Sequence, residues 1–430
     1  MVLRAVPSSP QLAFATEGGT HAPFVRHQVE QDRLGWLVAF ASFTMLVLVS
    51  WSTTGAGGWQ TTIAVLLFLA PWAWIVLRQP GDIIRSIITN WPIIALPTWA
   101  LLSVIWSDYP SGSLKSGAEL LATVTIGIWA GHCIKPRILT SALLSALMLT
   151  AVLGIVLATK DRGINGYIDG LVGLFGSKNY FALYASCLLL TTVAVVLDNA
   201  QPPRLRVVGF VGALLAQSLL VSAHSLDALV SSYAALAFVS ILWLTRRLAP
   251  TPRLAVLVVV ILILFLIPLL GSIEFSFADL LGYFGKNVTL TGRTQLWDNA
   301  QIAIAERPLL GVGYEAYWVA GNWRAEQLWM FAGLHGTTGY HFHNTYLQVM
   351  VDLGYIGLLL LLIPFVIMAG RMIGRILYST PSPSQVFAMS ILIFLVLRSP
   401  LEVDLLFPFQ LPSVLIGLSW VYLQPKTASL

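Results

Sequence analysis

Two short polar segments carry most of the side chains that could do chemistry. Residues 339–348 read Gly-Tyr-His-Phe-His-Asn-Thr-Tyr-Leu-Gln, and residues 292–297 read Gly-Arg-Thr-Gln-Leu-Trp. An imidazole can take a proton from a hydroxyl near neutral pH, so His343 is a candidate general base. A guanidinium binds phosphate oxygens through paired hydrogen bonds, which makes Arg293 a candidate phosphate ligand. The alternatives are a histidine hydrogen-bonded to a backbone carbonyl and an ordinary surface arginine.

The two imidazoles at 341 and 343 also have a spacing that can hold a metal ion. His335 or Asp352 would supply a third ligand. A His-x-His pair without a recognisable set of further ligands is a weak metal signal. We therefore predict no metal site and no cofactor.

Further polar residues stand near the ends of apolar runs. Arg398 precedes Glu402 by four positions, so Glu402 is either a structural partner of the arginine or part of a site with it. We predict six substrate-binding residues: Arg398, Lys178, Asn179, Lys115, Asn344 and His224. Alternatively, the lysine side chains at helix ends only extend their charged groups to the membrane surface. His224 could likewise belong to a plain turn before Asp227.

The composition excludes water as the solvent for most of this surface. Hydrophobic residues make up 57% and charged residues 10% of 430 residues, whereas a soluble domain has about 25% charged residues. The chain is therefore an integral membrane protein. Its net charge of +5 is a signal of membrane topology and not of nucleic-acid binding. Cys133 and Cys187 fall within apolar runs and suggest neither a disulfide framework nor a cysteine metal site.

Twelve apolar runs are long enough to cross a bilayer as helices. They lie at about 34–54, 59–77, 87–106, 115–133, 138–158, 179–197, 207–223, 226–244, 254–270, 344–369, 385–403 and 407–423. With a cytoplasmic amino terminus, lysine and arginine occur in every cytoplasmic loop, as the positive-inside rule requires. We predict an all-α integral membrane protein with about 12 transmembrane helices and both termini in the cytoplasm.

Two parts of the chain depart from this pattern. Residues 1–33 have no short apolar core with a cleavage site, so we predict a disordered cytoplasmic tail and not a signal peptide. Residues 34–430 form a single polytopic domain, with a large loop on the non-cytoplasmic side at about 271–343, too long for a passive connection. Within that loop, 300–307 has helical periodicity until Pro308, which predicts short amphipathic helices on the outer membrane surface.

From about residue 95 onward, ordered motifs resemble the bacterial O-antigen ligase and O-antigen or exopolysaccharide polymerase superfamily. The motifs are Leu102-Ser-Val-Ile-Trp-Ser-Asp-Tyr-Pro110 with Ser113-Leu-Lys115, Gly173-Leu-Phe-Gly-Ser-Lys-Asn179, the segment 292–297, Glu306-Arg-Pro-Leu-Leu-Gly-Val-Gly-Tyr314, and His343-Asn344 to Leu347 followed by Gly354 and Gly357. The resemblance rests on the order of these motifs and on their common predicted placement on the outer face.

The resemblance implies a multi-helix fold in the bacterial inner membrane, with a large periplasmic loop and the active site on the periplasmic face. It also implies glycan transfer from undecaprenyl pyrophosphate without a nucleotide sugar or an essential metal. His343 then corresponds to the catalytic histidine, the base for the acceptor hydroxyl, and Arg293 to a loop arginine that engages the donor diphosphate. Fixed cations in a partly dehydrated pocket would stabilise the charge that develops on the leaving diphosphate.

One departure from the family pattern separates its branches. Ligases commonly carry a further arginine in a serine-rich motif near the outer end of a mid-chain helix, whereas residues 222–227 here read Ser-Ala-His-Ser-Leu-Asp. The segments 106–115, 175–179 and 398–402 look closer to the exopolysaccharide-polymerase branch.

We therefore predict a polymerase that transfers a glycan from its lipid carrier to the sugar of the next lipid-linked repeat unit. Arg293, with Arg398 or Lys178, would hold the donor diphosphate. The expected partners are the undecaprenyl-pyrophosphate-linked glycan, membrane lipids, a chain-length regulator and a flippase. The alternatives are a ligase that moves glycan to lipid A core, and a transporter with an ion path through His224, Asp227 and Arg398.

Overall fold

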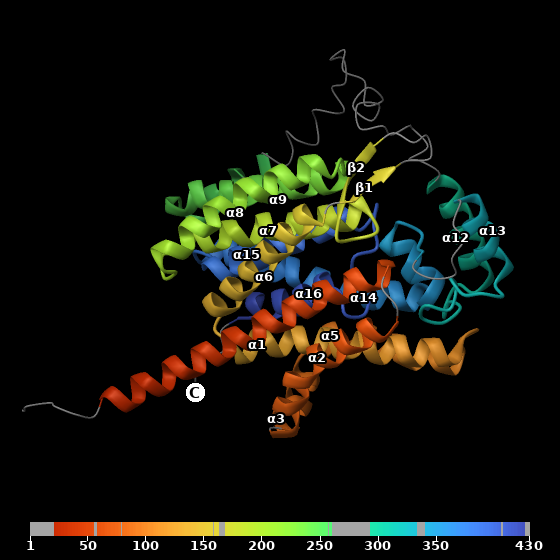
Figure 1. Cartoon of the computed structure of the whole chain (residues 1–430), viewed down its shortest axis with the longest axis horizontal. Coiled ribbons are helices and arrows are strands. Elements are labelled where there is room, and N and C mark those ends of the chain that lie inside the picture. The colour runs from red at the N-terminus through yellow and green to blue at the C-terminus, as the bar shows by residue number, and fades with distance from the viewer. Residues whose placement is uncertain are drawn as a thin grey trace, which may run out of the picture.

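The computed structural model describes residues 21–55, 58–78, 80–157, 159–162, 168–256, 258–259, 293–332, 340–405 and 407–425. These residues are mostly helical (Figure 1). The helices are α1 (His21–Gly55), α2 (Gly58–Arg78), α3 (Pro80–Thr89), α4 (Trp91–Leu102), α5 (Pro110–Cys133), α6 (Pro136–Val156), α7 (Lys178–Leu197), α8 (Pro203–Ser222), α9 (Leu226–Leu244), α12 (Arg293–Glu306), α13 (Trp323–Phe331), α14 (Thr345–Tyr378), α15 (Pro383–Arg398) and α16 (Leu411–Leu423), with short 3₁₀ turns at Ser103–Ile105 and Thr245–Arg247. Strands β1 (Thr159–Arg162) and β2 (Ile168–Gly173) form an antiparallel hairpin.

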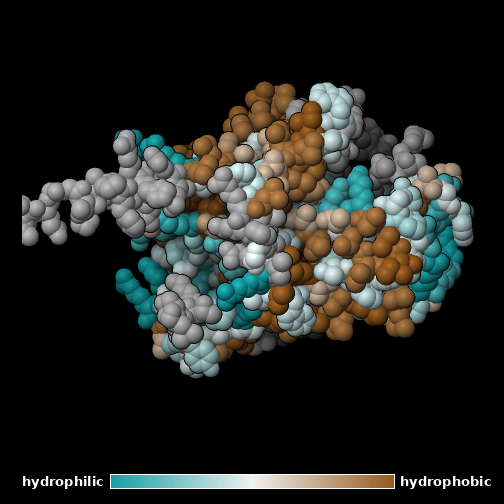
Figure 2. Space-filling model, turned by 90° about the horizontal axis from the view of Figure 1, so that it is seen from below, coloured by the Kyte–Doolittle hydropathy of each residue, from teal (hydrophilic) through white to brown (hydrophobic). Residues whose placement is uncertain are grey.

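Six of the described helices are long and apolar enough to cross a membrane. They are Asp32–Ser50 within α1, α6, α7, α8, Leu226–Arg247 and α14, and shorter apolar helices accompany them. Most of these helices run lengthwise and side by side in Figure 1. Apolar side chains dominate the middle of the face in Figure 2, while hydrophilic ones gather toward its two ends. The architecture is that of an all-α, multi-pass membrane protein.

The predicted apolar runs overlap described helices, except that the run at 254–270 lies largely outside the described residues. The count of twelve therefore stays a prediction. Two predicted boundaries are wrong. Helix α1 begins at His21, so residues 21–33 are helical, and the helix extends upstream of its apolar core. Helix α15 ends at Arg398 and not at 403, because Pro400 has no amide hydrogen to continue the helix.

The loop helices agree with the predicted periodicity at 300–307. Helix α12 covers that segment and ends just before Pro308, and α13 follows it. Figure 1 shows both helices at one end of the long axis, beyond the bundle. The β1–β2 hairpin near that end was not predicted from the sequence. The start of the predicted loop, 271–292, and its segment 333–339 lie outside the described residues.

A break in α14 fixes where α12 lies. Gly354 has φ +67°, and a Cβ atom there would collide with the carbonyl oxygen of Leu309. The amides of Val312 and Gly313 donate to the carbonyls of residues 351 and 352, each at 2.9 Å, and the amide of residue 355 donates to Pro308 at 2.8 Å. The Gly-Val-Gly segment at 311–313 thus forms hydrogen bonds with the backbone groups around the break and holds the loop helices against α14.

A second set of helix contacts brings together the other elements of the site. Helix α15 packs against α7, α9 and α16, and α7 packs against α9. The amino-terminal ends of α7 and α9 therefore meet the carboxyl-terminal end of α15. The polar residues just outside these three helix ends face one another.

Candidate active site

A cavity of about 270 Å³ lies where the start of α7, the segment before α14 and the α15–α16 loop meet. Its described lining residues are Gly176, Ser177, Asn179, Tyr180, Tyr340, His341, His343, Arg398, Glu402, Val403 and Asp404. Three segments widely separated in the sequence thus contribute to one polar-lined site.

His343 lies half-buried in a tight turn beside this cavity. Its backbone adopts φ +51°, and its amide donates to Nδ1 of His341 at 3.0 Å. Its own Nδ1 lies 3.1 Å from Oε2 of Glu402. An ionised carboxylate can only accept, so we assign the imidazole proton to Nδ1. Nε2 then carries the free lone pair, which is what a general base requires.

The turn that carries His343 is held by hydrogen bonds from two directions. Trp297 of α12 donates from Nε1 to the carbonyl of Phe342 at 3.0 Å, and the Phe342 amide donates to Oε1 of Gln348 at 3.2 Å. Thr345 donates from its amide to Ser399 at 2.8 Å and from its hydroxyl to the Glu402 carbonyl at 2.7 Å. The segment that carries His343 and the loop that carries Glu402 are therefore tied directly to each other.

Asn344 caps helix α14. Its Oδ1 accepts hydrogen bonds from the amides of Tyr346 and Leu347, at 3.0 and 3.1 Å. This bonding gives Asn344 a clear structural role, which is to start the helix directly after His343. Its predicted part in substrate binding stays a prediction.

Glu402 is the centre of the polar cluster and is only 4% exposed. Its Oε1 accepts from Arg293 and from Nδ2 of Asn179, each at 2.7 Å, while Oε2 faces His343. Burial by itself would raise the pKa of this carboxyl, but the His343 imidazole and the Arg293 guanidinium outweigh burial and bring the pKa below its usual range. Glu402 is therefore ionised and orients both proposed catalytic side chains.

Arg293 is the first residue of α12 and is 7% exposed. Trp297 lies four positions later, so both residues lie on one helix face. Both reach the same turn region, Trp297 through the Phe342 carbonyl and Arg293 through Glu402. This explains the spacing in the Gly-Arg-Thr-Gln-Leu-Trp motif.

Arg398 also lines the cavity, but its charge is balanced by two carboxylates. Its Nε donates to Asp404 at 2.6 Å, and one terminal nitrogen forms an ion pair with Asp227 at 2.9 Å. Of the two alternatives for Glu402, direct pairing with Arg398 is wrong, because α15 stops at Arg398 and Glu402 pairs with Arg293 of α12 instead. Both residues nevertheless line the same cavity. The Ser225 hydroxyl lies 2.7 Å from Oδ1 of Asp227 and 3.0 Å from Oδ1 of Asn179, so its one proton is shared between these two acceptors. A hydrogen-bonded network thus runs from Arg398 to Glu402.

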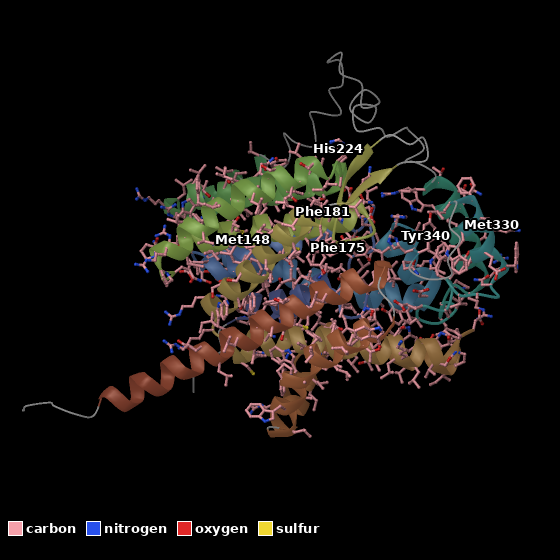
Figure 3. The ribbon with its side chains drawn as sticks, viewed as in Figure 1. Met148, Phe175, Phe181, His224, Met330 and Tyr340 are labelled. Atoms are coloured by element: carbon pink, nitrogen blue, oxygen red, sulfur yellow. The ribbon has the colours of Figure 1, made fainter. Side chains whose placement is uncertain are left out.

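The remaining predicted substrate-binding residues lie elsewhere among the described residues. Lys178 is buried at the start of α7, and its alkyl chain lies near Gly170 of β2. Lys115 is an exposed residue of α5 that acts electrostatically on Glu315. His224 is exposed in the α8–α9 turn, as Figure 3 shows beside the hairpin. These three do not line the cavity that His343 lines.

The cluster also contains the ligand types of a metal site. His341, His343 and Glu402 offer donor atoms that all lie within 4.8 Å of one another. Asp352, considered earlier as a third ligand, instead accepts from Gln348 at 3.0 Å, and His335 lies outside the described residues. Arg293 already neutralises Glu402, and a second cation beside it would be repelled. The arrangement suits an anionic ligand better than a metal ion.

His341 packs under the turn and is 6% exposed. Burial lowers its pKa to about 3, the neighbouring His343 and Arg293 lower it further, and Glu402 opposes the change. His341 therefore stays neutral near neutral pH. Its Nδ1 accepts the amide of His343, so its role is to hold the turn.

The fold and the site together define a multi-pass membrane protein with a histidine, a carboxylate and an arginine gathered at one cavity. Residues 210–362, which include Arg293 and His343, match the family model described as O-antigen ligase. The chain is also 29% identical over 356 residues to the "Exopolysaccharide production protein ExoQ" of Rhizobium meliloti (strain 1021), across 82% of this chain and 81% of that protein. Both similarities support the resemblance to the superfamily of O-antigen ligases and O-antigen or exopolysaccharide polymerases.

Proposed function

We propose that this protein is a glycan polymerase that uses a donor linked to a polyprenyl pyrophosphate. It transfers the growing glycan to the sugar of another lipid-linked repeat unit in surface polysaccharide assembly. The observation that carries the proposal is the arrangement of His343 and Arg293 on either oxygen of Glu402, beside a polar cavity. The match to an exopolysaccharide production protein supports the same reading.

The proposed reaction uses His343 as the base. Nε2 takes the proton of the acceptor hydroxyl while that oxygen forms a bond to the anomeric carbon of the donor sugar. The bond between the anomeric carbon and the diphosphate oxygen breaks, and the diphosphate leaves with the electron pair. Glu402 stabilises the imidazolium that results, since it faces Nδ1 at 3.1 Å. No metal ion takes part in these steps.

Arg293 stabilises the leaving diphosphate. A guanidinium has five N–H donors, so Arg293 can keep its bond to Glu402 and still bind phosphate oxygens. Its position in a largely buried site strengthens the attraction over what water would allow. Arg398, neutralised by Asp404 and Asp227, instead supports the cavity wall. This refines the predicted role of Arg398 in holding the diphosphate.

We propose that the cavity faces the periplasm and that both termini lie in the cytoplasm of a bacterial inner membrane. Helix α14 has 34 residues, which is roughly 50 Å of helix. It starts at the cavity and has Arg371 and Arg375 near its far end, where Arg375 donates to Gln424 just after α16. Basic residues at that end fit a cytoplasmic side. A chain-length regulator and a flippase are the proposed protein partners.

The test is complementation of a strain that lacks this gene. Variants His343→Ala and Arg293→Ala should leave no high-molecular-weight polymer, at normal protein level in the membrane. Matched controls are His132→Ala, an exposed histidine of α5, and Arg324→Ala, whose guanidinium pairs with Glu306 on the surface. Both controls should make full-length polymer. Full-length polymer from His343→Ala or Arg293→Ala would refute the roles given to them.

A ligase remains the second candidate because the family model that matches is described as O-antigen ligase. The two activities leave different products in the deletion strain. Single repeat units attached to the final acceptor indicate a polymerase, because the chain is never extended. Long chains left on the carrier lipid indicate a ligase.

A further inference from the structure

Tyr340 is an aromatic residue of the cavity wall that the proposed chemistry does not use. Its ring centroid lies 5.9 Å from that of His343, with the planes at 81°. Burial raises the pKa of its hydroxyl, and the positive charge of Arg293 opposes that rise. Tyr340 is therefore close to the proposed base and within electrostatic reach of the proposed diphosphate ligand. In Figure 3 it lies between the loop helices and the bundle.

The neighbours of Tyr340 hold its ring in place. Trp318 contacts it edge to face, with centroids 5.0 Å apart and an angle of 86°. Trp318 in turn packs against Phe342 at 4.8 Å and Trp329 at 6.3 Å. These three supporting rings are buried, whereas Tyr340 is half-buried and reaches the cavity. The His341 ring stacks beside it as well, with centroids 6.5 Å apart, so the part of Tyr340 that lines the cavity is a contact surface preorganised by its neighbours.

We propose that Tyr340 is the stacking platform for the acceptor sugar. One face of a pyranose ring presents C–H groups, and the negative π face of an aromatic ring attracts them while the sugar hydroxyls remain at the edge. The imidazole of His343 stands almost perpendicular to the Tyr340 ring, and its Nε2 lone pair lies in the imidazole plane. In the proposed pose, a sugar lying flat on the part of Tyr340 that borders the cavity turns an edge hydroxyl toward the base.

The cavity that Tyr340 lines has a volume of about 270 Å³. We place the terminal sugar of the acceptor against Tyr340 in this subsite. This inference rests on the proposed function, since it names the acceptor side of the same reaction.

The test compares Tyr340→Phe, Tyr340→Trp and Tyr340→Leu in the full-length protein in lipid nanodiscs. The probe is the free repeat-unit oligosaccharide, released by mild acid from the carrier lipid of a strain that lacks this gene. Its affinity is measured by calorimetry. Phe and Trp keep an aromatic face, so affinity should stay within about twofold of the native protein. Leu keeps apolar contact but has no π face, so affinity should fall about three- to tenfold. Tyr355→Leu, at an exposed tyrosine of α14, is the matched control and should change nothing.

Equal affinity in all three variants, or a Phe variant as weak as the Leu variant, would overturn the platform. Inorganic pyrophosphate is the second probe and reports on the Arg293 side. If the native protein binds neither probe, the proposed function fails. If it binds both and the Leu variant binds the oligosaccharide as well as the native protein does, the stacking inference alone fails. If Tyr340→Leu also abolishes pyrophosphate binding, Tyr340→Trp decides. Native-like affinity of Tyr340→Trp for the oligosaccharide supports the platform, and weakened affinity refutes it.

Discussion

Replacement of Glu402 by glutamine tests how one carboxylate serves two catalytic side chains. Glutamine keeps the shape of the side chain but turns one oxygen into a donor. In the native site Oε1 accepts from Arg293 and Asn179, and Oε2 faces Nδ1 of His343. The new amide nitrogen must therefore face either Arg293 or His343, and the two choices differ in energy.

The structure indicates which choice the amide makes. If the nitrogen turns toward Arg293, the guanidinium loses its oxygen partner. Arg293 is only 7% exposed, so this loss costs about 3–5 kcal/mol. Turning the nitrogen toward His343 costs less, because the imidazole can move its proton to Nε2 and accept at Nδ1. That tautomer cannot act as the base. The comparable change in serine protease triads lowers kcat about 10⁴-fold, so we expect a fall of about 10²- to 10⁴-fold here.

The assay is polymer formation by the purified full-length protein in nanodiscs with lipid-linked repeat units. Glu402→Gln should lose activity as stated and still unfold cooperatively, at a lower temperature because the buried Arg293 loses its counter-charge. Glu402→Asp should retain more activity because it keeps the charge. The matched control is Glu306→Gln, which removes a surface partner of Arg324. A Glu402→Gln rate within about threefold of the native rate would show that Glu402 does not set the His343 tautomer.

Three further predictions concern the supports of the site. Arg398→Leu leaves the buried Asp227 and Asp404 unpaired, so the unfolding free energy should fall by about 3–5 kcal/mol, measured by thermal unfolding; an unchanged transition would contradict the ion-pair assignment. Gly311→Ala forces a side chain onto φ +68° with its Cβ 2.5 Å from a residue 352 carbonyl, so the melting temperature should drop, whereas Gly370→Ala, in open space, should not lower it through a steric clash. Burial raises the pKa of Glu315 from 4.5 to about 7, although the Ser116 hydrogen bond opposes this, so its stabilising contribution is full below pH 4.5 and is lost as pH rises toward 7. The melting temperature of Glu315→Gln relative to that of the native protein should therefore rise between pH 5 and 8. A difference in melting temperature that stays constant over this range would refute the pKa shift.

The sequence predicted the class of fold well because its signals are local. A run of apolar residues specifies a membrane helix wherever it occurs, and the periodicity at 300–307 specifies α12. The same locality explains the errors. Position 403 looked helical by hydropathy, but Pro400 ends the helix at Arg398. Pro400 was the sequence signal for the end of this helix, but the predicted boundary followed hydropathy alone.

The contacts of the site depend on distant segments and could not be read from spacing. The spacing of four residues offered Arg398 as one possible partner of Glu402, yet Glu402 pairs with Arg293 across 109 positions. Asp227, whose partner is Arg398, lies on another helix altogether. Position at a helix end likewise does not tell which way a side chain points, so Lys115 and His224 were grouped with a cavity that they do not line.

The most direct test of the central claim is chemical rescue of the proposed base. His343→Gly in the purified full-length protein leaves a space beside Glu402 into which free imidazole can diffuse. We predict that this variant makes no polymer from lipid-linked repeat units and that added imidazole restores polymer formation in a concentration-dependent way. Undiminished polymer formation by His343→Gly without imidazole would contradict the claim that His343 accepts the acceptor proton.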